Sequence, residues 1–305
     1  MPELPEVETI RRQLEPELTG RVIESARVLD ERWTRPVPPR RVAHRLGGRR
    51  IESVGRRGKY IVLELDGGDA LAMHLRMTGN LLLRDGAADV RRLGGERLYE
   101  GSPEARYLRA ALELDGGLEL WFTDPRRFGQ AVFLRRDQVE QYFAGRVGIE
   151  PLSKELTAAE LAREALGRTA PLKSFLLDQS HVAGVGNIYA DEALWRARLH
   201  PLSPAGSMRL EHCEDLRRGI IDALEAGLRT GGASVDDYRD ARGERGAMQD
   251  EFCVHTRAGE ACFRCDGTIR RIALGGRSTY FCPGCQRRLR QRPRRGRGRR
   301  AAGAR

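Results

Sequence analysis

Two closely spaced cysteine pairs near the C-terminus constrain the fold more than any other feature of this sequence. Cys262 and Cys265 form the stretch CFRC, Cys282 and Cys285 form CPGC, and 16 residues separate the pairs. Four thiolates on two tight turns can make a closed tetrahedral site, the usual structural arrangement for one Zn²⁺. The same soft ligands also suit a redox-active site or an iron–sulfur cluster. The spacing favours zinc.

The stretch between the pairs, GTIRRIALGGRSTYF, predicts a β-hairpin with its turn at Gly275 and Gly276. A metal with four protein ligands has no open coordination position. We therefore expect it to rigidify a small hairpin that could not fold alone, rather than to catalyse a reaction. Arg277 follows the turn, where an exposed hairpin would present it. From its position alone, Arg277 is best interpreted as a solvated arginine.

Length and hydropathy describe an ordinary globular chain. Of its 305 residues, 40% are hydrophobic, and at about 100–200 residues per domain this length predicts about two domains. The sequence has no apolar run long enough to span a bilayer, and its acidic start lacks the basic-then-apolar order of a secretory signal. We therefore expect no membrane association and a cytoplasmic location.

The net charge of +11 is concentrated at the C-terminus. Residues 286–305 contain 10 arginines and no acidic residue, which leaves 44 basic and 43 acidic side chains in residues 1–285. The tail has too little apolar surface to fold, so we predict that residues 289–305 are disordered. It could hold phosphates without sequence preference or only keep the chain soluble, and both interpretations stay open.

The first half of the chain has one helical pattern followed by strand patterns. Residues 3–18 have apolar side chains at helical spacing and acidic residues in the first turn, where the helix dipole favours them. Short β-forming stretches follow, separated by glycine-rich turns, and predict a sandwich or barrel. These stretches are residues 22–29, 60–65, 70–75, 80–83, 118–122 and 131–134. Residues 85–107 are polar and predict a long surface loop.

The second half is predominantly helical. Helices are predicted over residues 156–167, 170–179, 187–199 and 210–232, the last ending at Gly231 and Gly232. The expected fold class is α+β and multidomain. It comprises an N-terminal helix with a β-sandwich domain in residues 1–135, a helical domain in residues 136–250, the Cys₄ zinc-finger β-hairpin in residues 251–288, and the tail.

The opening MPELPEVETI is unusual for an N-terminus. Removal of Met1 would make Pro2 a terminal secondary amine with a pKa near ~8. Such an amine can attack an electrophilic sugar carbon and form an iminium, and the neighbouring Glu3 and Glu6 could transfer protons. Taken as composition only, the same residues simply begin a helix, and that interpretation would be preferred.

Several separated motifs change this interpretation. The chain contains GRRGKYIVLEL, HLRMTG, TDPRRFG, GIEPLS and LLDQSHVAGVGNIYADEALWRARLHP, between the opening and the Cys₄ module. Together and in this order they resemble the bacterial formamidopyrimidine-DNA glycosylases, in the wider family that includes the endonuclease VIII-like enzymes. The resemblance covers nearly the whole chain except the tail, residues 85–107 and parts of 203–250. It identifies the helical domain with the family's helix–two-turns–helix DNA-binding domain.

The resemblance implies catalytic roles by position. Pro2 matches the nucleophile that attacks C1′ of the damaged nucleotide, Glu3 the residue that assists proton transfer, and Glu6 a supporting carboxylate. Lys59 matches the lysine assigned to proton transfer in β-elimination and to a nearby phosphate contact. Arg277 matches the hairpin arginine that binds phosphate at the lesion and is implicated in δ-elimination.

A second group of residues is implied to contact DNA. Chemistry on a base inside a duplex requires that the nucleotide be extruded and the gap filled. Met77, Arg126 and Phe128 match the family's three void-filling residues. An apolar side chain can hold the kinked step open, and an arginine can bond to the cytosine left behind.

Further DNA contacts are implied on the helical domain and beside the wedge. Asn187 lies at a glycine-rich turn whose N–H groups and following helix N-terminus are expected to face phosphate. Lys173 matches a phosphate-binding lysine, and His74 lies in a motif that faces DNA. Two matches are weaker: Tyr107 stands where the family often has a histidine, and Arg168 stands near a patch usually rich in lysine.

The expected protein is a monomeric, bifunctional DNA N-glycosylase and AP lyase of base-excision repair that acts on damaged double-stranded DNA. It would remove formamidopyrimidines and 8-oxoguanine opposite cytosine and cut the strand by β,δ-elimination. Residues 231–250 occupy the place of a variable loop over the extruded base, so the damage preference is less constrained than the reaction. The alternatives are an endonuclease VIII-like enzyme for oxidised pyrimidines and a catalytically silent damaged-DNA-binding protein.

Overall fold

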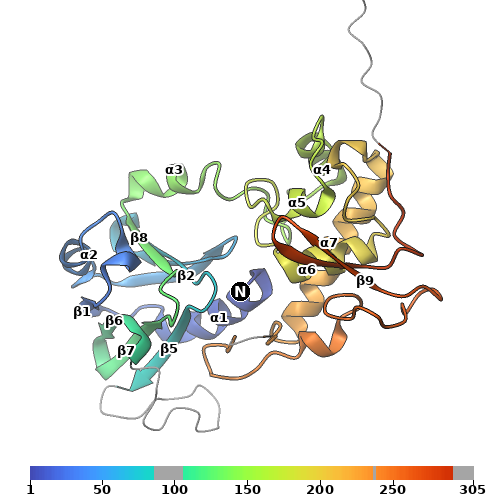
Figure 1. Ribbon diagram of the computed structural model, residues 1–305. Coiled ribbons are helices and arrows are strands. Elements are labelled where there is room, and N and C mark those ends of the chain that lie inside the picture. Colours follow the sequence, from blue (N-terminus) through green and yellow to red (C-terminus); the bar gives the residue numbers. More distant parts are fainter. Residues whose placement is uncertain (86–105, 236–237, 291–305) are drawn as a thin grey trace, which may run out of the picture.

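The computed structural model describes residues 1–85, 106–235 and 238–290. A β-rich half and a helical half lie on opposite sides of the amino end of the chain (Figure 1). Most of the surface loop predicted at 85–107 and most of the predicted tail lie outside the described residues. No helix in the described part of the chain is long and apolar enough to cross a membrane.

Helix α1 (Leu4–Leu18) joins the two halves, because its buried face belongs to both cores. Val7, Ile10 and Leu14 pack into the core of the β-rich half, whereas Leu4 packs into the core of the helical half. The predicted helical spacing is confirmed, since Leu4, Val7, Ile10, Leu14 and Leu18 are all fully buried. A change in the orientation of α1 would therefore disturb both halves.

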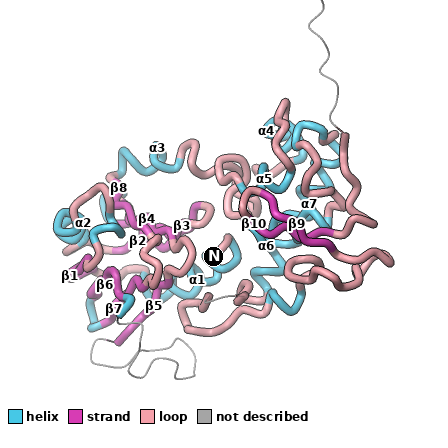
Figure 2. The backbone as a smooth tube through the Cα atoms, in the orientation of Figure 1, coloured by secondary structure: helices cyan, strands magenta, loops and turns pink. Residues whose placement is uncertain are grey.

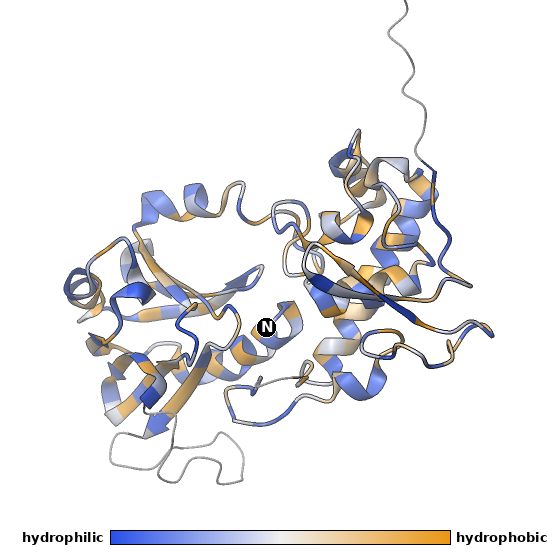
Figure 3. Ribbon diagram, viewed as in Figure 1, coloured by the Kyte–Doolittle hydropathy of each residue, from blue (hydrophilic) through white to orange (hydrophobic). Residues whose placement is uncertain are grey.

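The β-rich half is a sandwich of two antiparallel four-stranded sheets, as predicted. One sheet has the order β1-β6-β7-β5, with β1 (Ile23–Val28), β6 (Leu108–Leu114), β7 (Leu118–Thr123) and β5 (Asn80–Asp85). The other has the order β2-β3-β4-β8, with β2 (Ile51–Arg57), β3 (Tyr60–Leu65), β4 (Ala70–His74) and β8 (Gln130–Leu134). Hydrophobic residues recur along these strands (Figure 3).

Two strands and one α-helix in the described part of this half were not predicted: β2, β6 and α2 (Pro39–Leu46). Strand β6 reads LRAALEL, a composition that favours a helix. It is a strand because it pairs with β1 on one edge and β7 on the other, so tertiary pairing overrides local propensity.

The helical half contains the four predicted helices: α4 (Ala158–Ala165), α5 (Leu172–Leu177), α6 (Asn187–Arg196) and α7 (Leu210–Arg229). A short helix, α3 (Val139–Phe143), lies on the connection between the halves (Figure 2). Helices α6 and α7 approach closely at Gly219, where a Cβ would lie 2.5 Å from the Ala193 carbonyl oxygen. Helix α7 stops before Gly231, whose φ is +70°, as the sequence predicts.

The predicted hairpin is also present, with strands β9 (Arg270–Leu274) and β10 (Arg277–Phe281). It docks on α6, where the Tyr280 N–H of β10 donates to Asp191 at 3.2 Å, and the next residue of α6, Glu192, is fully buried. The Glu192 carboxylate accepts hydrogen bonds from the N–H groups of Cys253, Val254 and His255 at 2.9–3.1 Å. It also pairs with Arg196 at 2.8 Å. One buried carboxylate thus holds the zinc module against the helical half.

We predict that Glu192→Ala lowers the free energy of unfolding by about 3–5 kcal/mol, because it leaves three N–H groups and Arg196 without their partner in the interior. Denaturant unfolding measures the change. Glu225→Ala on the exposed face of α7 is the control and should shift stability by less than about 0.5 kcal/mol. Equal shifts in the two variants would contradict this role for Glu192.

Candidate active site and DNA interface

A pocket of about 400 Å³ lies where the two halves and the hairpin meet. Met1 and Glu3 line it from the start of the chain, Met77 from the β-rich half, and Asn187 and Ile188 from the start of α6. The rest of the lining comes from Ala233, Val235, Tyr238, His255, Thr256, Arg277, Ser278 and Tyr280. The volume lies in the ~300–1,000 Å³ range of ligand sites. The fold therefore brings Glu3, Met77, Asn187 and Arg277, which are far apart in sequence, to one cavity.

Glu3 is held at the amino end of α6. Its carboxylate accepts hydrogen bonds from the N–H groups of Gly186 at 2.8 Å, Ile188 at 3.0 Å and Tyr189 at 3.3 Å. Exposed N–H groups and the helix dipole favour a negative charge at this place. A Cβ on Gly186 would lie 2.3 Å from the Glu3 Cδ. Gly186 is therefore needed for this approach.

This contact bears on one expectation. The resemblance implies that the glycine-rich turn and the N-terminus of α6 face phosphate, and in this structure three of their N–H groups, those of Gly186, Ile188 and Tyr189, bind the Glu3 carboxylate. Asn187 remains in the pocket lining, and its buried Oδ1 has no hydrogen-bond partner among the described residues. Asn187 thus presents its side chain to the pocket, and the phosphate contact that the resemblance implies at this residue stays a prediction.

Glu6 connects α1 to the segment after α7. Its buried carboxylate accepts hydrogen bonds from the Glu3 N–H at 2.8 Å, the Tyr189 hydroxyl at 2.7 Å and the Ala233 N–H at 2.7 Å. Burial, followed by the nearby charge of Glu3, raises the pKa of Glu6. Gly232, with φ of +89°, permits the contact, because a Cβ there would lie 2.7 Å from Glu6 Cγ. Glu6 thus fixes the positions of Glu3 and Ala233, which line the pocket.

Lys59 is presented by the turn between β2 and β3, after Gly58, whose φ is +55°. Its side chain is buried, and burial lowers the pKa of its amine, while the charges of Glu3 and Glu6 oppose the shift. Arg277 lowers the same pKa. Lys59 therefore shares one electrostatic environment with the pocket residues, and its neutral form, which can accept a proton, is more populated than in free lysine.

His74 ends β4 and is buried. Burial, together with the charges of Arg76 and Lys59, lowers its pKa to about 3, so the imidazole is neutral. The Arg76 N–H donates to His74 Nδ1 at 3.0 Å. The ring proton is therefore on Nε2, and Nε2–H is the donor that His74 can offer.

The three residues that the resemblance implies as void-filling lie on two adjacent loops. Met77 and Phe128 are large apolar side chains with exposed fractions of 39% and 52%. The Arg126 guanidinium lies over the Phe128 ring, 5.0 Å from its centroid. Tyr107 lies at the base of the second loop, where its carbonyl oxygen accepts the Asp124 N–H at 2.9 Å. Large apolar side chains exposed together are typical of an interaction surface.

Lys173 and Arg168, both implied to contact the DNA backbone, differ in exposure. Lys173 is fully buried, with its ammonium 2.7 Å from an Asp191 carboxylate oxygen and donating to the Ser278 carbonyl at 2.8 Å. Burial lowers its pKa. A phosphate on the surface cannot reach this group in the described structure. Arg168 is exposed and lines a separate hollow with Asp178.

Sequence reasoning missed several residues that build the site. Tyr189 binds Glu6. Asp191 pairs with Lys173 and accepts hydrogen bonds from His255 Nδ1 at 3.0 Å and the Tyr280 N–H at 3.2 Å. Tyr189 and Asp191 fall inside a quoted motif, but nothing in their spacing shows that α6 presents them toward α1 and β10.

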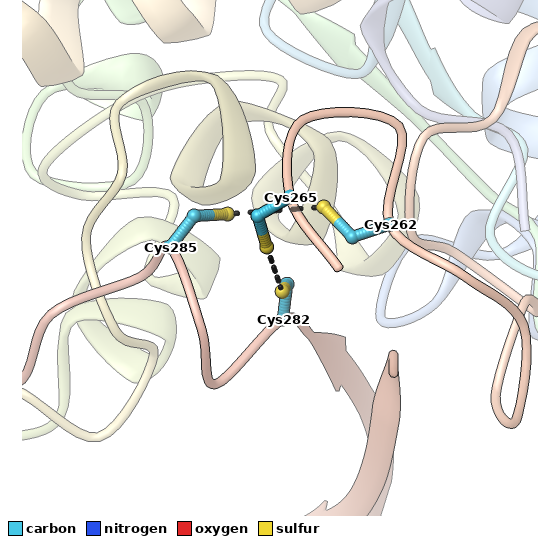
Figure 4. Close-up of side chains that lie close together, drawn as sticks. All are labelled: Cys262, Cys265, Cys282 and Cys285. Carbon is cyan, nitrogen blue, oxygen red and sulfur yellow. Dashed lines mark hydrogen bonds between the residues drawn. The ribbon is translucent and has the colours of Figure 1, made fainter. Parts of the chain in front are cut away.

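The four cysteines form a site that fits one Zn²⁺. Their sulfur atoms all lie within 4.8 Å of one another, with 3.9 Å between Cys262 and Cys285 and 3.5 Å between Cys265 and Cys282 (Figure 4). A tetrahedron with Zn–S bonds of about 2.3 Å requires sulfurs about 3.8 Å apart, whereas a disulfide requires about 2.05 Å. The Arg264 and Trp195 N–H groups donate to Cys262 Sγ and, against burial, lower its pKa to about 6. Zn²⁺ here is structural.

We predict that Gly186→Ala slows the strand cleavage expected from the sequence by about 100-fold, because the added Cβ displaces the Glu3 carboxylate. Single-turnover cleavage and bound zinc measure activity and integrity separately. The control is Gly47→Ala, since Gly47 has φ of −59° and a Cβ there would meet no heavy atom closer than 3.8 Å. Wild-type cleavage by Gly186→Ala would contradict the role assigned to this contact.

Comparison with known proteins assigns the family. The formamidopyrimidine-DNA glycosylase N-terminal domain matches residues 1–131, the H2TH domain of the same enzyme matches residues 147–239, and the zinc finger found in FPG and IleRS matches residues 259–288. The formamidopyrimidine-DNA glycosylase of Chloroflexus aurantiacus is 44% identical over 288 residues, covering 94% of this chain and 98% of that protein. That of Azorhizobium caulinodans is 44% identical over 298 residues, covering 94% and 100%.

Solved structures agree with this assignment. A Lactococcus lactis FPG mutant in complex with Fapy-dG-containing DNA has a TM-score of 0.81 and 33% identity, covering 94% of this chain and 100% of that chain. The MutM (FPG) protein of Thermus thermophilus has a TM-score of 0.78 and 40% identity, covering 93% and 98%. With the Glu3 pocket and the zinc site, these matches show that the chain belongs to the formamidopyrimidine-DNA glycosylase family and is a zinc-finger DNA glycosylase of base-excision repair.

Proposed function

We propose that this glycosylase removes oxidised purines, namely formamidopyrimidines and 8-oxoguanine opposite cytosine. It then cuts the strand by β,δ-elimination. The observation that carries this proposal is that Glu3 and Arg277 line one pocket, while Pro2 directly precedes Glu3 and Lys59 is buried close enough for both charges to shift its pKa. Pro2 and Glu3 begin the chain, Lys59 comes from the sandwich and Arg277 from the hairpin. The related Lactococcus lactis FPG is described in complex with Fapy-dG DNA, which supports the same substrate class here.

Pro2 is the proposed nucleophile. After Met1 is removed, its amine attacks C1′ of the damaged nucleotide, and the C1′–N bond breaks as the base leaves with a proton. The attached amine loses its proton, the C1′–O4′ bond breaks as O4′ takes up a proton, and an iminium then joins Pro2 to the opened sugar. Three N–H groups hold the Glu3 carboxylate in one orientation next to Pro2, where it can relay protons and stabilise positive charge on the sugar.

Lys59 and Arg277 serve the elimination steps. A neutral Lys59 amine takes the C2′ proton, and the 3′ phosphate leaves in β-elimination; loss of the 5′ phosphate follows in δ-elimination. The lowered pKa of Lys59 favours this neutral form. Arg277, exposed at the start of β10 and lining the pocket, binds the phosphate at the lesion. All of these groups come from one chain, which supports action as a monomer.

The pocket and the two exposed loops support recognition of an extruded nucleotide. Ile188 and Val235 give the pocket an apolar wall for a base, and Asn187 adds a polar side chain. Met77, Arg126 and Phe128 would enter the duplex and fill the gap. His74 offers its Nε2–H to the backbone of the damaged strand.

Borohydride reduction tests the covalent step. On a duplex with 8-oxoguanine opposite cytosine we expect a trapped adduct that maps to Pro2, because the iminium is reduced to a stable amine. A chain that keeps Met1 is the control and should give no adduct, since the nucleophile is blocked. An adduct only on a matched thymine-glycol duplex would favour an oxidised-pyrimidine enzyme. No adduct on either duplex would favour a silent DNA-binding protein.

The pH dependence of strand cleavage tests Lys59. Because burial lowers its pKa, cleavage of a preformed abasic site should rise with pH through a value below 10.5 as the neutral amine becomes populated. Lys59→Gln should lose this rise and slow cleavage by about 100-fold. Lys154→Gln changes an exposed lysine and should keep the wild-type profile. An unchanged profile in Lys59→Gln would assign the proton transfer to another group.

A further inference from the structure

Asp124 is a fully buried carboxylate that the proposed chemistry does not use. It directly follows β7 and receives three hydrogen bonds from two loops. Oδ1 accepts the Thr78 hydroxyl at 2.5 Å and the Arg126 N–H at 3.1 Å. Oδ2 accepts the Gly129 N–H at 2.7 Å. A buried charge persists only when it is paired or hydrogen-bonded in this way.

Thr78 is the direct link between the loops. It follows Met77, and its hydroxyl donates to Asp124 and accepts the Arg126 N–H at 3.3 Å. One hydroxyl therefore connects the loop that carries Met77 to the loop that carries Arg126 and Phe128. A longer, exposed contact at 3.4 Å runs from Arg76 to Gln130, the first residue of β8.

Both loops also rest on one aromatic ring. A Cβ on Gly79 would lie 3.0 Å from Phe122 Cζ, and a Cβ on Gly129 would lie 2.5 Å from the same atom. Each loop therefore has a glycine where it crosses Phe122. The Phe122 ring and the Asp124 carboxylate therefore both limit how far the two loops can move relative to each other.

The backbone of both loops is strained. Arg76 has φ of +55° and Arg127 has φ of +59°, which is uncommon for residues other than glycine. Arg127 is held by Asp30, which accepts its guanidinium N–H groups at 2.5 and 2.9 Å. Such conformations persist where surrounding contacts enforce them, and they are frequent at functional sites.

We propose that Thr78 and Asp124 are positioning residues that join the two loops into one rigid unit, so that Met77, Arg126 and Phe128 enter the duplex together. This inference rests on the proposed insertion of these side chains during base excision. A unit that is ordered before binding loses less conformational freedom when it inserts. The orientation of Arg126 toward the opposite base then depends on Thr78, a residue of the other loop.

The test compares a substrate that needs insertion with one that does not. Thr78→Val removes the hydroxyl at nearly constant volume. We expect about tenfold slower single-turnover cleavage of a lesion duplex, with a weaker preference for cytosine over adenine opposite the lesion. Cleavage of a single-stranded oligonucleotide with an abasic site should not change, because it has no duplex to hold open.

Two further variants distinguish a loss of loop positioning from a nonspecific loss of protein stability. Thr78→Ser keeps the hydroxyl and should restore the duplex rate. Thr157→Val removes a threonine hydroxyl that accepts a backbone N–H at the start of α4, remote from both loops, and should leave both rates unchanged. Equal slowing of Thr78→Val on both substrates, or no slowing on either, would overturn the inference.

A double-mutant cycle measures the coupling directly. Met77→Ala and Phe128→Ala should be non-additive in their effects on duplex cleavage, and the coupling should disappear in the Thr78→Val background. Additive effects in the otherwise wild-type chain would overturn the inference while leaving the proposed function intact. If the wild-type chain cut neither substrate, the proposed function would fail, and this inference with it.

Discussion

The contact between the Glu3 carboxylate and the first N–H groups of α6 is the interaction on which the rest of the site depends. It satisfies backbone donors that the end of a helix leaves free and places a negative charge where the helix dipole favours it. Because Glu3 directly precedes α1, the same contact attaches the N-terminus of the chain to the helical half. Gly186 makes it sterically possible. The position of the proposed nucleophile is thus determined by helix capping.

Burial of charged side chains then changes the pKa values of the groups next to Glu3. Glu6 and Lys59 have pKa values shifted in opposite directions from their usual values, each mainly because water is excluded. Lys173 and Asp191 pair beneath the pocket and hold the backbone of β10 at Ser278 and Tyr280. The hairpin that presents Arg277 is therefore held both by its metal site and by a buried ion pair.

Sequence patterns predicted those parts of the fold that depend on residues close together in the chain, such as ligand spacing and hydrophobic period. The spacing of Cys262, Cys265, Cys282 and Cys285 predicted the zinc hairpin, because four soft ligands on two turns have few other arrangements. The spacing of Leu4, Val7 and Ile10 predicted α1. Strand β6 was missed because its alanines and leucines suit a helix, and only pairing with two neighbouring strands makes it extended. The inward direction of Lys173 was missed because spacing does not show which partner a helix faces.

By itself, the sequence determined the fold class, the metal ligands and, through motif resemblance, which side chains are candidates for chemistry. Tertiary structure alone decided which partners those side chains have. It bonded the N–H groups of Gly186, Ile188 and Tyr189 to Glu3, buried Lys173 beside Asp191, and connected the loops of Met77 and Phe128 through Asp124. The physical reason is that ligand spacing and hydrophobic period are local properties of the chain. Hydrogen bonds and desolvation inside a pocket depend instead on residues that only the folded chain brings together.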